Sequence, residues 1–320
     1  MKRKSVIGIL ICFISTCFCL SQSLFDEGTK LFTEKKYQEA KSVFEQVLKS
    51  HSHKAEANYF LGKTHFELGD FDEAEDFLQA AIEVDDRRID YHLALATVYQ
   101  EKTRAASFIS APFLAKKWLE QLETAFSLDT HHLDARRRLI QYYLNAPGIG
   151  GGDKEKGTRL AEETIKLDEL QGRLLYASAL SRTDKQDSAI EEYKKVLKLD
   201  PQNGSVYNLL GYIYLKRKDF AAAEIHFKKY IDVAPQSPNA YDSMGDYYLE
   251  RGMLDDAIVR FEKALDIDAN SSESRFKLAE TFVKKNLKKE ARYHLQTLLK
   301  LTPRHFRVED AKELLDELED

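Results

Sequence analysis

Asp242 and Asp246 have the residue type and spacing of a carboxylate pair that could do acid–base chemistry. Residues four apart lie on one face of a helix, where one carboxyl group could donate a proton while the other accepts one. Charged helix faces are usually just solvated, however. The glycine-flanked serine of a hydrolase elbow is absent from the sequence. We therefore predict no catalytic residue and no enzymatic activity.

A glycine-rich string, GIGGGDK over residues 148–154, could offer clustered backbone amides to a phosphate group. The dinucleotide-binding fingerprint would need glycine where Asp153 stands, and a Walker loop would need Gly-Lys followed by Ser or Thr. No strand is expected before the string. We interpret it as a structural or partner-contacting loop between helices and predict no cofactor.

Histidine pairs are the candidates for metal ligands. His51 and His53 flank one expected turn, and His131 and His132 lie at another. A built zinc site needs three or four ligands, often at a helical spacing such as HExxH, and the sequence contains no such pattern. We interpret these histidines as solvated turn residues and predict no metal site.

The elements that carry these residues recur every 34 residues between Gly204 and His305. Four landmarks return at this step: Gly211, Tyr214, Ala223 and Phe227 become Gly245, Tyr248, Ala257 and Phe261, and then Ala279, Phe282, Ala291 and Leu295. A period of this length is typical of a solenoid, which grows by adding units rather than by enlarging one core.

Each unit is predicted to be a helical hairpin. Apolar residues three and four apart form two amphipathic stripes, interrupted near residues 216–220 and again near 234–238. The small Gly211 should let the first helix approach the second closely, and Ala223 should serve the same contact from the other side. A large side chain at either position would separate the two helices.

The landmarks resemble the tetratricopeptide repeat, whose pattern places a small residue, an aromatic, an alanine, an aromatic or leucine, and often a proline at set positions. Gly211, Tyr214, Ala223, Phe227 and Pro235 fill these positions in one unit. The resemblance implies an all-α, right-handed superhelical solenoid of helix-turn-helix repeats. With the N-terminal segment described next, it suggests an exported protein of bacterial type.

The N-terminus has the layout of a secretory signal peptide. Residues 2–4 are basic, residues 6–20 are apolar, and polar sequence follows. The apolar run is shorter than the roughly 17–25 residues of a membrane span. We predict cleavage after Ser21 and export to the periplasm or the exterior, with no integral membrane span left in the mature chain. An uncleaved anchor and a lipoprotein modified at Cys17 remain alternatives.

Composition limits the mature protein further. All cysteines lie in the predicted signal segment (Cys12, Cys17 and Cys19), so the mature chain can form no disulfide and offers no thiolate. Loss of Lys2, Arg3 and Lys4 changes the formal net charge from −5 to −8. A mildly acidic chain disfavours nucleic acid as a partner, because that binding needs clustered lysine and arginine.

We predict three regions: a signal peptide at 1–21, a solenoid of about eight repeats at 22–305, and a capping helix at 306–320 whose apolar face contains Ala311 and Leu318. Terminal repeats need such a cap. The repeats are expected at roughly 21–54, 55–88, 89–132, 133–171, 172–203, 204–237, 238–271 and 272–305.

The third and fourth repeats depart from the regular step. Extra sequence lies between their helices, at 103–113 and at 145–156, and Trp118 and Gly157 replace the usual alanine. Equivalent loops of neighbouring repeats should project side by side from one edge. As a possible docking site in these loops we single out Phe108, Phe113, Gly148, Gly150 and Gly151.

The resemblance also implies a concave groove lined by first-helix residues. The matching positions are Phe25, Phe32, Tyr59, Lys63 and Phe66 near the N-terminus, and Arg137, Gln141, Asn208, Tyr212, Asp242 and Asp246 further along. Exposed aromatics are favoured interface anchors, although each could instead pack against a neighbouring helix. The family's clamp for chaperone tails needs Lys and Asn where this chain has Phe25 and Thr29, so a cytosolic chaperone is not expected.

From these observations we predict a non-catalytic scaffold or adaptor that binds a protein or peptide, either in the cell envelope or after secretion. The alternative is a structural subunit of an envelope complex that docks through the loops at 103–113 and 145–156. The partner's identity and the oligomeric state do not follow from the sequence, because a fold does not determine a function.

Overall fold

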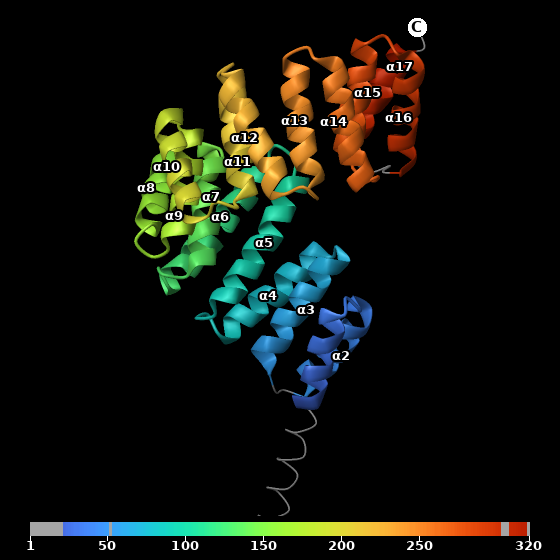
Figure 1. The fold of residues 1–320 in the computed structure, drawn as a ribbon. Coiled ribbons are helices and arrows are strands. Elements are labelled where there is room, and N and C mark those ends of the chain that lie inside the picture. The colour runs from blue at the N-terminus through green and yellow to red at the C-terminus, as the bar shows by residue number, and fades with distance from the viewer. Residues whose placement is uncertain (1–21, 51–52, 302–306, 319–320) are drawn as a thin grey trace, which may run out of the picture. The chain divides into compact units, whose positions relative to one another are not determined.

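A computed structural model describes residues 22–50, 53–301 and 307–318. The predicted signal peptide and its cleavage site lie outside these ranges. Every regular element in them is a helix, and they contain no strand (Figure 1). The predicted all-α class is therefore confirmed. None of the helices in the described ranges is both long and apolar enough to cross a membrane.

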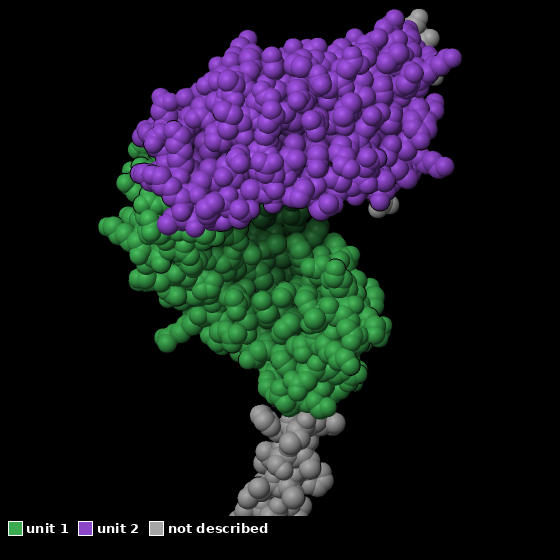
Figure 2. All heavy atoms as spheres, in the orientation of Figure 1, with its two compact units in different colours: residues 1–183 green, residues 184–320 purple. Residues whose placement is uncertain are grey.

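The helices fall into two compact units, divided between Thr183 and Asp184 (Figure 2). In the first unit a helix over residues 22–33 is followed by α2 (Tyr37–Lys49), α3 (Lys54–Leu68), α4 (Phe71–Val84), α5 (Ile89–Ala105), α6 (Ala111–Leu128), α7 (Leu133–Asn145), the 3-10 helix η1 (Gly148–Gly150), α8 (Lys154–Thr164) and α9 (Glu169–Arg182). The second unit contains α10 (Gln186–Leu199), α11 (Gly204–Lys216), α12 (Phe220–Val233), α13 (Pro238–Glu250), α14 (Leu254–Ile267), α15 (Ser272–Lys284), α16 (Lys288–Leu301) and α17 (Val308–Glu317).

Consecutive helices pack as hairpins, among them α3 with α4, α5 with α6, α11 with α12 and α13 with α14. The close approach within α11–α12 is made by Gly211 against the ring of Phe227, because a Cβ atom on Gly211 would lie 2.5 Å from a ring carbon. Gly245 and Phe261 repeat this contact in α13–α14. Phe227 is therefore the side chain that lies closest to Gly211. The contact expected of Ala223 occurs at the equivalent pair of an earlier repeat, where a Cβ atom on Gly62 would lie 3.1 Å from the backbone of Ala74.

A left-handed residue ends the first helix of most hairpins. Positive φ angles recur at the 34-residue step, at Lys35 and Gly69 in the first unit and at Asp184, Lys218, Gly252 and Asn286 in the second. After Lys218, the amide of Asp219 donates to the carbonyl of Tyr214 at 3.0 Å, which is the bond of a Schellman helix end. This conformation reverses the chain within a few residues.

The third hairpin lacks that left-handed turn. Its first helix, α5, continues through Thr103 to Ala105, and α6 begins at Ala111, so only residues 106–110 are non-helical. The prediction of an enlarged loop at 103–113 is therefore wrong, because most of the extra residues lengthen the two helices. Lysine, arginine and alanine after Glu101 are good helix formers, and Pro112 lies in the first turn of α6.

Trp118 remodels the contact between α5 and its neighbours. Its half-buried ring packs edge-on against Tyr142 of α7, with ring centroids 4.8 Å apart. The apolar side chains of the inserted segment do not contribute, because Phe108 is 95% exposed and Phe113 is 71% exposed. The tryptophan itself, rather than the insertion, fills the space beside α7.

The glycine-rich connection of the fourth hairpin folds back on α6. Tyr142 Oη lies 2.6 Å from the carbonyl oxygens of both Ala115 and Gly150, and a Cβ atom on Gly151 would lie 2.6 Å from Leu119. Thus the connection of the fourth hairpin packs against α6 of the third.

Four backbone N–H groups of this connection already donate hydrogen bonds within the fold. Gly150 and Gly152 donate to Pro147, Gly151 donates to Gly148, and Asp153 donates to Tyr143, at 2.9–3.1 Å. Gly157, at the usual alanine position, packs on Leu144 and Tyr143, where a Cβ atom would lie 3.1 Å from both side chains. A phosphate would have to break the four backbone bonds, so the glycines serve the fold.

The junction of α8 and α9 is compressed. α9 begins at Glu169, three residues before the predicted repeat boundary at 172. Gly172 makes the short connection possible, because a Cβ atom there would overlap the backbone of Thr164 and Ile165. Any larger residue would force the two helices apart.

At the C-terminal end of the second unit, α17 covers the last hairpin. Val308, Ala311 and Leu318 are buried in one cluster with residues of α15 and α16, such as Leu278 and Leu298. The amphipathic helix expected after residue 306 is present in the described range 307–318, and its apolar face lies against this hairpin.

Candidate functional site

The N-terminal groove residues divide into packed and open side chains. Phe25 and Phe32 pack edge-on against Phe60, with ring centroids 5.6 and 5.8 Å apart, so they belong to the core of the first hairpins. Lys63 lies over this aromatic group, and its Nζ atom is 4.9 Å from the ring centroid of Phe32 and 5.2 Å from that of Tyr59. Aromatic faces attract a cation, which holds the Lys63 ammonium at the surface of the group.

Tyr59, Lys63 and Phe66 line a cavity of about 260 Å³ between α3, α5 and α7. The opposite wall is formed by Asp90, Leu93, Ala94 and Thr97 of α5 and by Asp134 and Arg138 of α7. Burial, together with the nearby Asp90 carboxylate, raises the pKa of Tyr59. Its hydroxyl therefore stays protonated as a donor at neutral pH.

Arg137 and Gln141 line a second cavity of about 520 Å³ between α5, α6 and α7. Other members of its wall are Gln100, Trp118, Tyr142 and Asn145. Thr97 and Arg138 line both cavities. The two cavities therefore adjoin along the first helices of three successive hairpins.

Arg138 forms the divide between the cavities. Its guanidinium donates to the Thr97 hydroxyl at 2.9 Å and pairs with Asp134 at 2.9 Å. Arg137 pairs with the same carboxylate. The groove thus combines an aromatic end, two arginines held by one aspartate, and amide side chains, which suits an extended segment with both apolar and polar groups.

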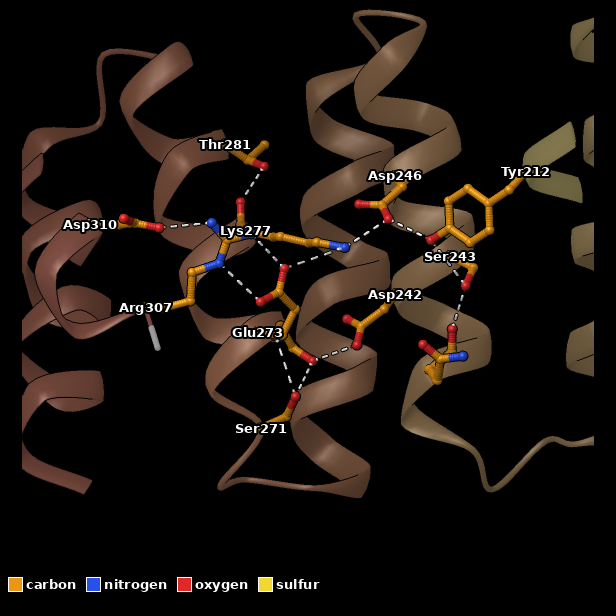
Figure 3. A network of polar contacts seen from close by, with 12 residues as sticks. Tyr212, Asp242, Ser243, Asp246, Ser271, Glu273, Lys277, Thr281, Arg307 and Asp310 are labelled. Atoms are coloured by element: carbon orange, nitrogen blue, oxygen red, sulfur yellow. Dashed lines mark hydrogen bonds and ion pairs between the residues drawn. The ribbon is translucent and has the colours of Figure 1, made fainter. Parts of the chain in front are cut away.

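Three of the predicted groove residues of the second unit, Tyr212, Asp242 and Asp246, make internal polar contacts (Figure 3). Asp246 accepts hydrogen bonds from Tyr212 Oη at 2.6 Å and from Lys277 Nζ at 2.7 Å. Burial and the Asp246 carboxylate raise the pKa of Tyr212 well above its ordinary value. The tyrosine therefore acts as a permanent donor across α11 and α13.

Asp242 is the most deeply buried of these carboxylates. It is 7% exposed, and its Oδ2 atom accepts from Ser274 at 2.8 Å. Its Oδ1 atom has no hydrogen-bond partner within the described residues, and the same is true of Asn208 Oδ1. Burial raises the pKa of Asp242 from 3.8 to about 6, against the lowering effect of Ser274.

The network continues to the C-terminal helix. Arg307 donates to both oxygens of Glu273 at 2.9 and 3.1 Å and to Asp310 at 2.8 Å (Figure 3). Lys277 Nζ lies 3.9 Å from Glu273. The charges on this face of the second unit therefore hold α13, α15 and α17 together. No group of three metal-ligating side chains occurs among the described residues.

Family models match the chain in four stretches. Models described as tetratricopeptide repeat match residues 31–98, 248–318 and 204–237, and one described as TPR repeat matches residues 182–218. Together these stretches exceed half of the sequence.

The chain belongs to the tetratricopeptide repeat family.

A solved structure of another tetratricopeptide repeat protein shares the fold of this one at low identity. The crystal structure of a tetratricopeptide repeat protein from Parabacteroides merdae superposes with a TM-score of 0.63 at 15% identity, over 82% of this chain and 98% of that one. A thermophilic TPR protein from Thermus thermophilus gives a TM-score of 0.44 at 20% identity, over 58% and 94% of the two chains.

Superkiller complex protein 3 of Mus musculus is 23% identical over 237 residues, which are 64% of this tetratricopeptide repeat chain. Our chain spans only 14% of the length of that relative. The likeness is therefore one of repeats, and it does not extend to the architecture of the whole mouse protein.

Sequence reasoning missed part of the groove of this tetratricopeptide repeat protein. Thr97 and Gln100 of the third repeat stand 34 residues after Lys63 and Phe66, so the signal for these two was present. Arg138 lies outside those positions and reaches the groove only because α5 and α7 approach each other there.

Proposed function

We propose that this tetratricopeptide repeat protein is a non-catalytic scaffold that binds an extended segment of a protein partner in the groove of its first unit. The observation that carries the proposal is the pair of adjoining cavities lined by Tyr59, Lys63 and Phe66 at one end and by Arg137 and Gln141 at the other. The corresponding residues of the second unit, such as Asp246, are engaged in internal contacts.

The family and the relatives support a role in protein interaction. The mouse relative, superkiller complex protein 3, is by its name a component of a complex. Aromatic side chains and arginines at the centre of a concave surface are frequent anchors of protein interfaces. The mixed charges of Lys63, Arg138 and Asp134 favour a partner segment that carries both polar and apolar side chains.

Site-specific photo-crosslinking in the native host tests the groove. A photoreactive residue at Lys63 or Gln141 should capture the same partner, because these positions line the two adjoining cavities. The matched control is Ile225, which is 60% exposed on α12 of the second unit. Capture of one partner from Ile225 but from neither groove position would refute the proposal.

An exported location is part of the proposal. It rests on the basic residues 2–4, the apolar residues 6–20 and the polar sequence that follows. N-terminal analysis of the protein purified from its host should find Gln22 as the first residue. A chain that begins at Cys17 with a lipid attached, or one that retains residues 1–21, would identify the anchored alternatives instead.

In the alternative role, as an assembly subunit, the protein would dock through the connections of the third and fourth hairpins. In the glycine-rich connection, Gly150 is buried, and Gly151 is packed on Leu119. Gly148 and Ile149 remain open to solvent. The connection of the third hairpin is the more exposed of the two.

A further inference from the structure

The connection between α5 and α6 presents its apolar side chains outward. We call residues 105–113 the α5–α6 tip. Within it, Phe108 is 95% exposed, Ile109 is 79% exposed and Phe113 is 71% exposed. Large apolar side chains that gather on a soluble surface usually mark an interaction site. Neither cavity of the groove includes these three residues.

Part of the backbone of the tip is hydrogen-bonded within the tip. The Ser107 carbonyl accepts from the amides of Ser110 and Ala111 at 3.1 and 2.9 Å, and the two serine hydroxyls lie 2.9 Å apart. The Ser110 carbonyl accepts from the amide of Phe113 at 3.1 Å. Backbone that enters an apolar medium must have its hydrogen bonds made internally, and the carbonyls of Ser107 and Ser110 meet that condition.

Cations border the tip on both sides. From residue 102 to residue 117 the sequence has four basic residues and no acidic one. Lys102 and Lys117 are held by Glu75 of α4, at 2.5 and 3.1 Å. Arg104 pairs with Glu101 at 2.6 Å but is 71% exposed, and Lys116 is exposed with no ion pair among the described residues. The guanidinium group of Arg104 and the ammonium group of Lys116 therefore face solvent beside the apolar side chains.

The size of the tip argues against a stable protein interface as its main purpose. Aromatic side chains bury 150–250 Å² each, so two phenylalanines and one isoleucine offer on the order of 500 Å². A standard protein interface needs about 800 Å² from each partner. A lipid bilayer needs no complementary surface, and a protruding apolar tip flanked by cations matches its acyl chains and anionic headgroups.

We propose that the α5–α6 tip inserts Phe108, Ile109 and Phe113 into the interfacial layer of a membrane that carries anionic lipids. Arg104 and Lys116 then lie at the level of the headgroups. This contact is independent of the partner groove. It would hold the first unit at a membrane surface without a membrane-spanning segment.

The test uses tryptophan emission, because the wild-type chain has a single tryptophan, Trp118. The full-length F108W variant is mixed with phosphatidylcholine vesicles that contain phosphatidylglycerol. We expect the emission of the new indole to shift to the blue and to be quenched by brominated acyl chains. The half-buried Trp118 of the wild-type protein should show neither change. Vesicles of phosphatidylcholine alone should give a smaller shift.

The serine variant F108S/I109S/F113S checks the three side chains together. On the processed chain that begins at Gln22, which lacks the apolar residues 6–20, it should weaken vesicle binding by at least tenfold relative to I225S, which removes an exposed apolar side chain of the second unit. Circular dichroism should be unchanged in both, because all four side chains are exposed. Absence of a blue shift in F108W with anionic vesicles overturns the proposal. The proposal is also overturned if the serine variant no longer captures a protein partner but binds vesicles as well as the wild-type protein does.

Discussion

At the scale of single residues, identical side chains of this protein have opposite roles. Asp246 is held by Tyr212 and Lys277, so its charge is compensated. Asp242 lies one helical turn away, is more deeply buried and receives one hydrogen bond, from Ser274. Desolvation without a full set of donors disfavours the charged form.

This difference predicts that Asp242 lowers the stability of the protein at neutral pH. Its pKa is raised from 3.8 to about 6 in the folded state, so folding takes up a proton between about pH 4 and pH 6. The free energy of unfolding should therefore fall as pH rises through this window, with a cost of about 3 kcal/mol at pH 7. D242N should remove most of that cost and flatten the pH dependence in urea unfolding.

D246N serves as the matched control, because it should act in the opposite direction. Loss of the carboxylate leaves the Lys277 ammonium without its closest acceptor, which costs about 1–3 kcal/mol. Equal destabilisation by D242N and D246N would contradict our interpretation of the network.

The close contact of Gly211 with Phe227 gives a second prediction at this scale. G211A adds a methyl group where a ring carbon already lies at 2.5 Å. Overpacking costs about 1–3 kcal/mol, which exceeds the helix-propensity gain of up to about 1 kcal/mol. G211A should therefore lower the free energy of unfolding measured in urea.

The chain itself supplies the compensating pair, since Ala279 and Leu295 stand at these two positions in the last repeat. The double variant G211A/F227L should be less destabilised than the sum of its single changes, with a coupling of about 0.5–3 kcal/mol. Additive effects would show that the two side chains do not compete for the same space.

At the scale of elements, the hairpin turns decide where each helix ends. Lys218 adopts φ of 60°, a conformation that costs a non-glycine residue about 1–2 kcal/mol. Gly252 occupies the equivalent position of the next repeat. Where no left-handed residue occurs, as at Thr103, the helix continues and the hairpin becomes longer.

K218G is predicted to stabilise the protein. Relief of the left-handed strain exceeds the backbone entropy that glycine loses on folding, for a net gain of about 0.5–1 kcal/mol. N286G, which changes the equivalent residue, should have almost no effect, because asparagine tolerates this conformation. Thermal unfolding followed by circular dichroism measures both. A larger gain from N286G than from K218G would be inconsistent with this explanation.

At the scale of the whole molecule, the same repeat positions are open in the first unit and engaged in internal contacts in the second. The first unit leaves cavities between its first helices, where Tyr59, Lys63 and Gln141 face the groove. The second unit joins the corresponding residues through Lys277 and Arg307 up to its last helix. We infer that recognition lies in the first unit and that the network of the second serves its stability.

The sequence by itself determined the all-α class, the repeat unit and the family, because 34-residue periodicity expresses local contacts within and between neighbouring hairpins. It also located the places where repeats three and four depart from the rule. These features depend on residues close in the chain, such as Gly211 and Phe227, whose relation is set by helix geometry.

Only the tertiary structure decided which polar residues remain open to a partner. The sequence predicts Asp242 and Asp246 as groove residues, yet their carboxylates accept hydrogen bonds from Ser274 and Lys277 of the next repeat. Likewise, extra residues near Phe108 read as a loop but extend two helices and expose an apolar tip. Periodicity places a side chain on a face, but packing against the adjacent repeat decides whether that face is free.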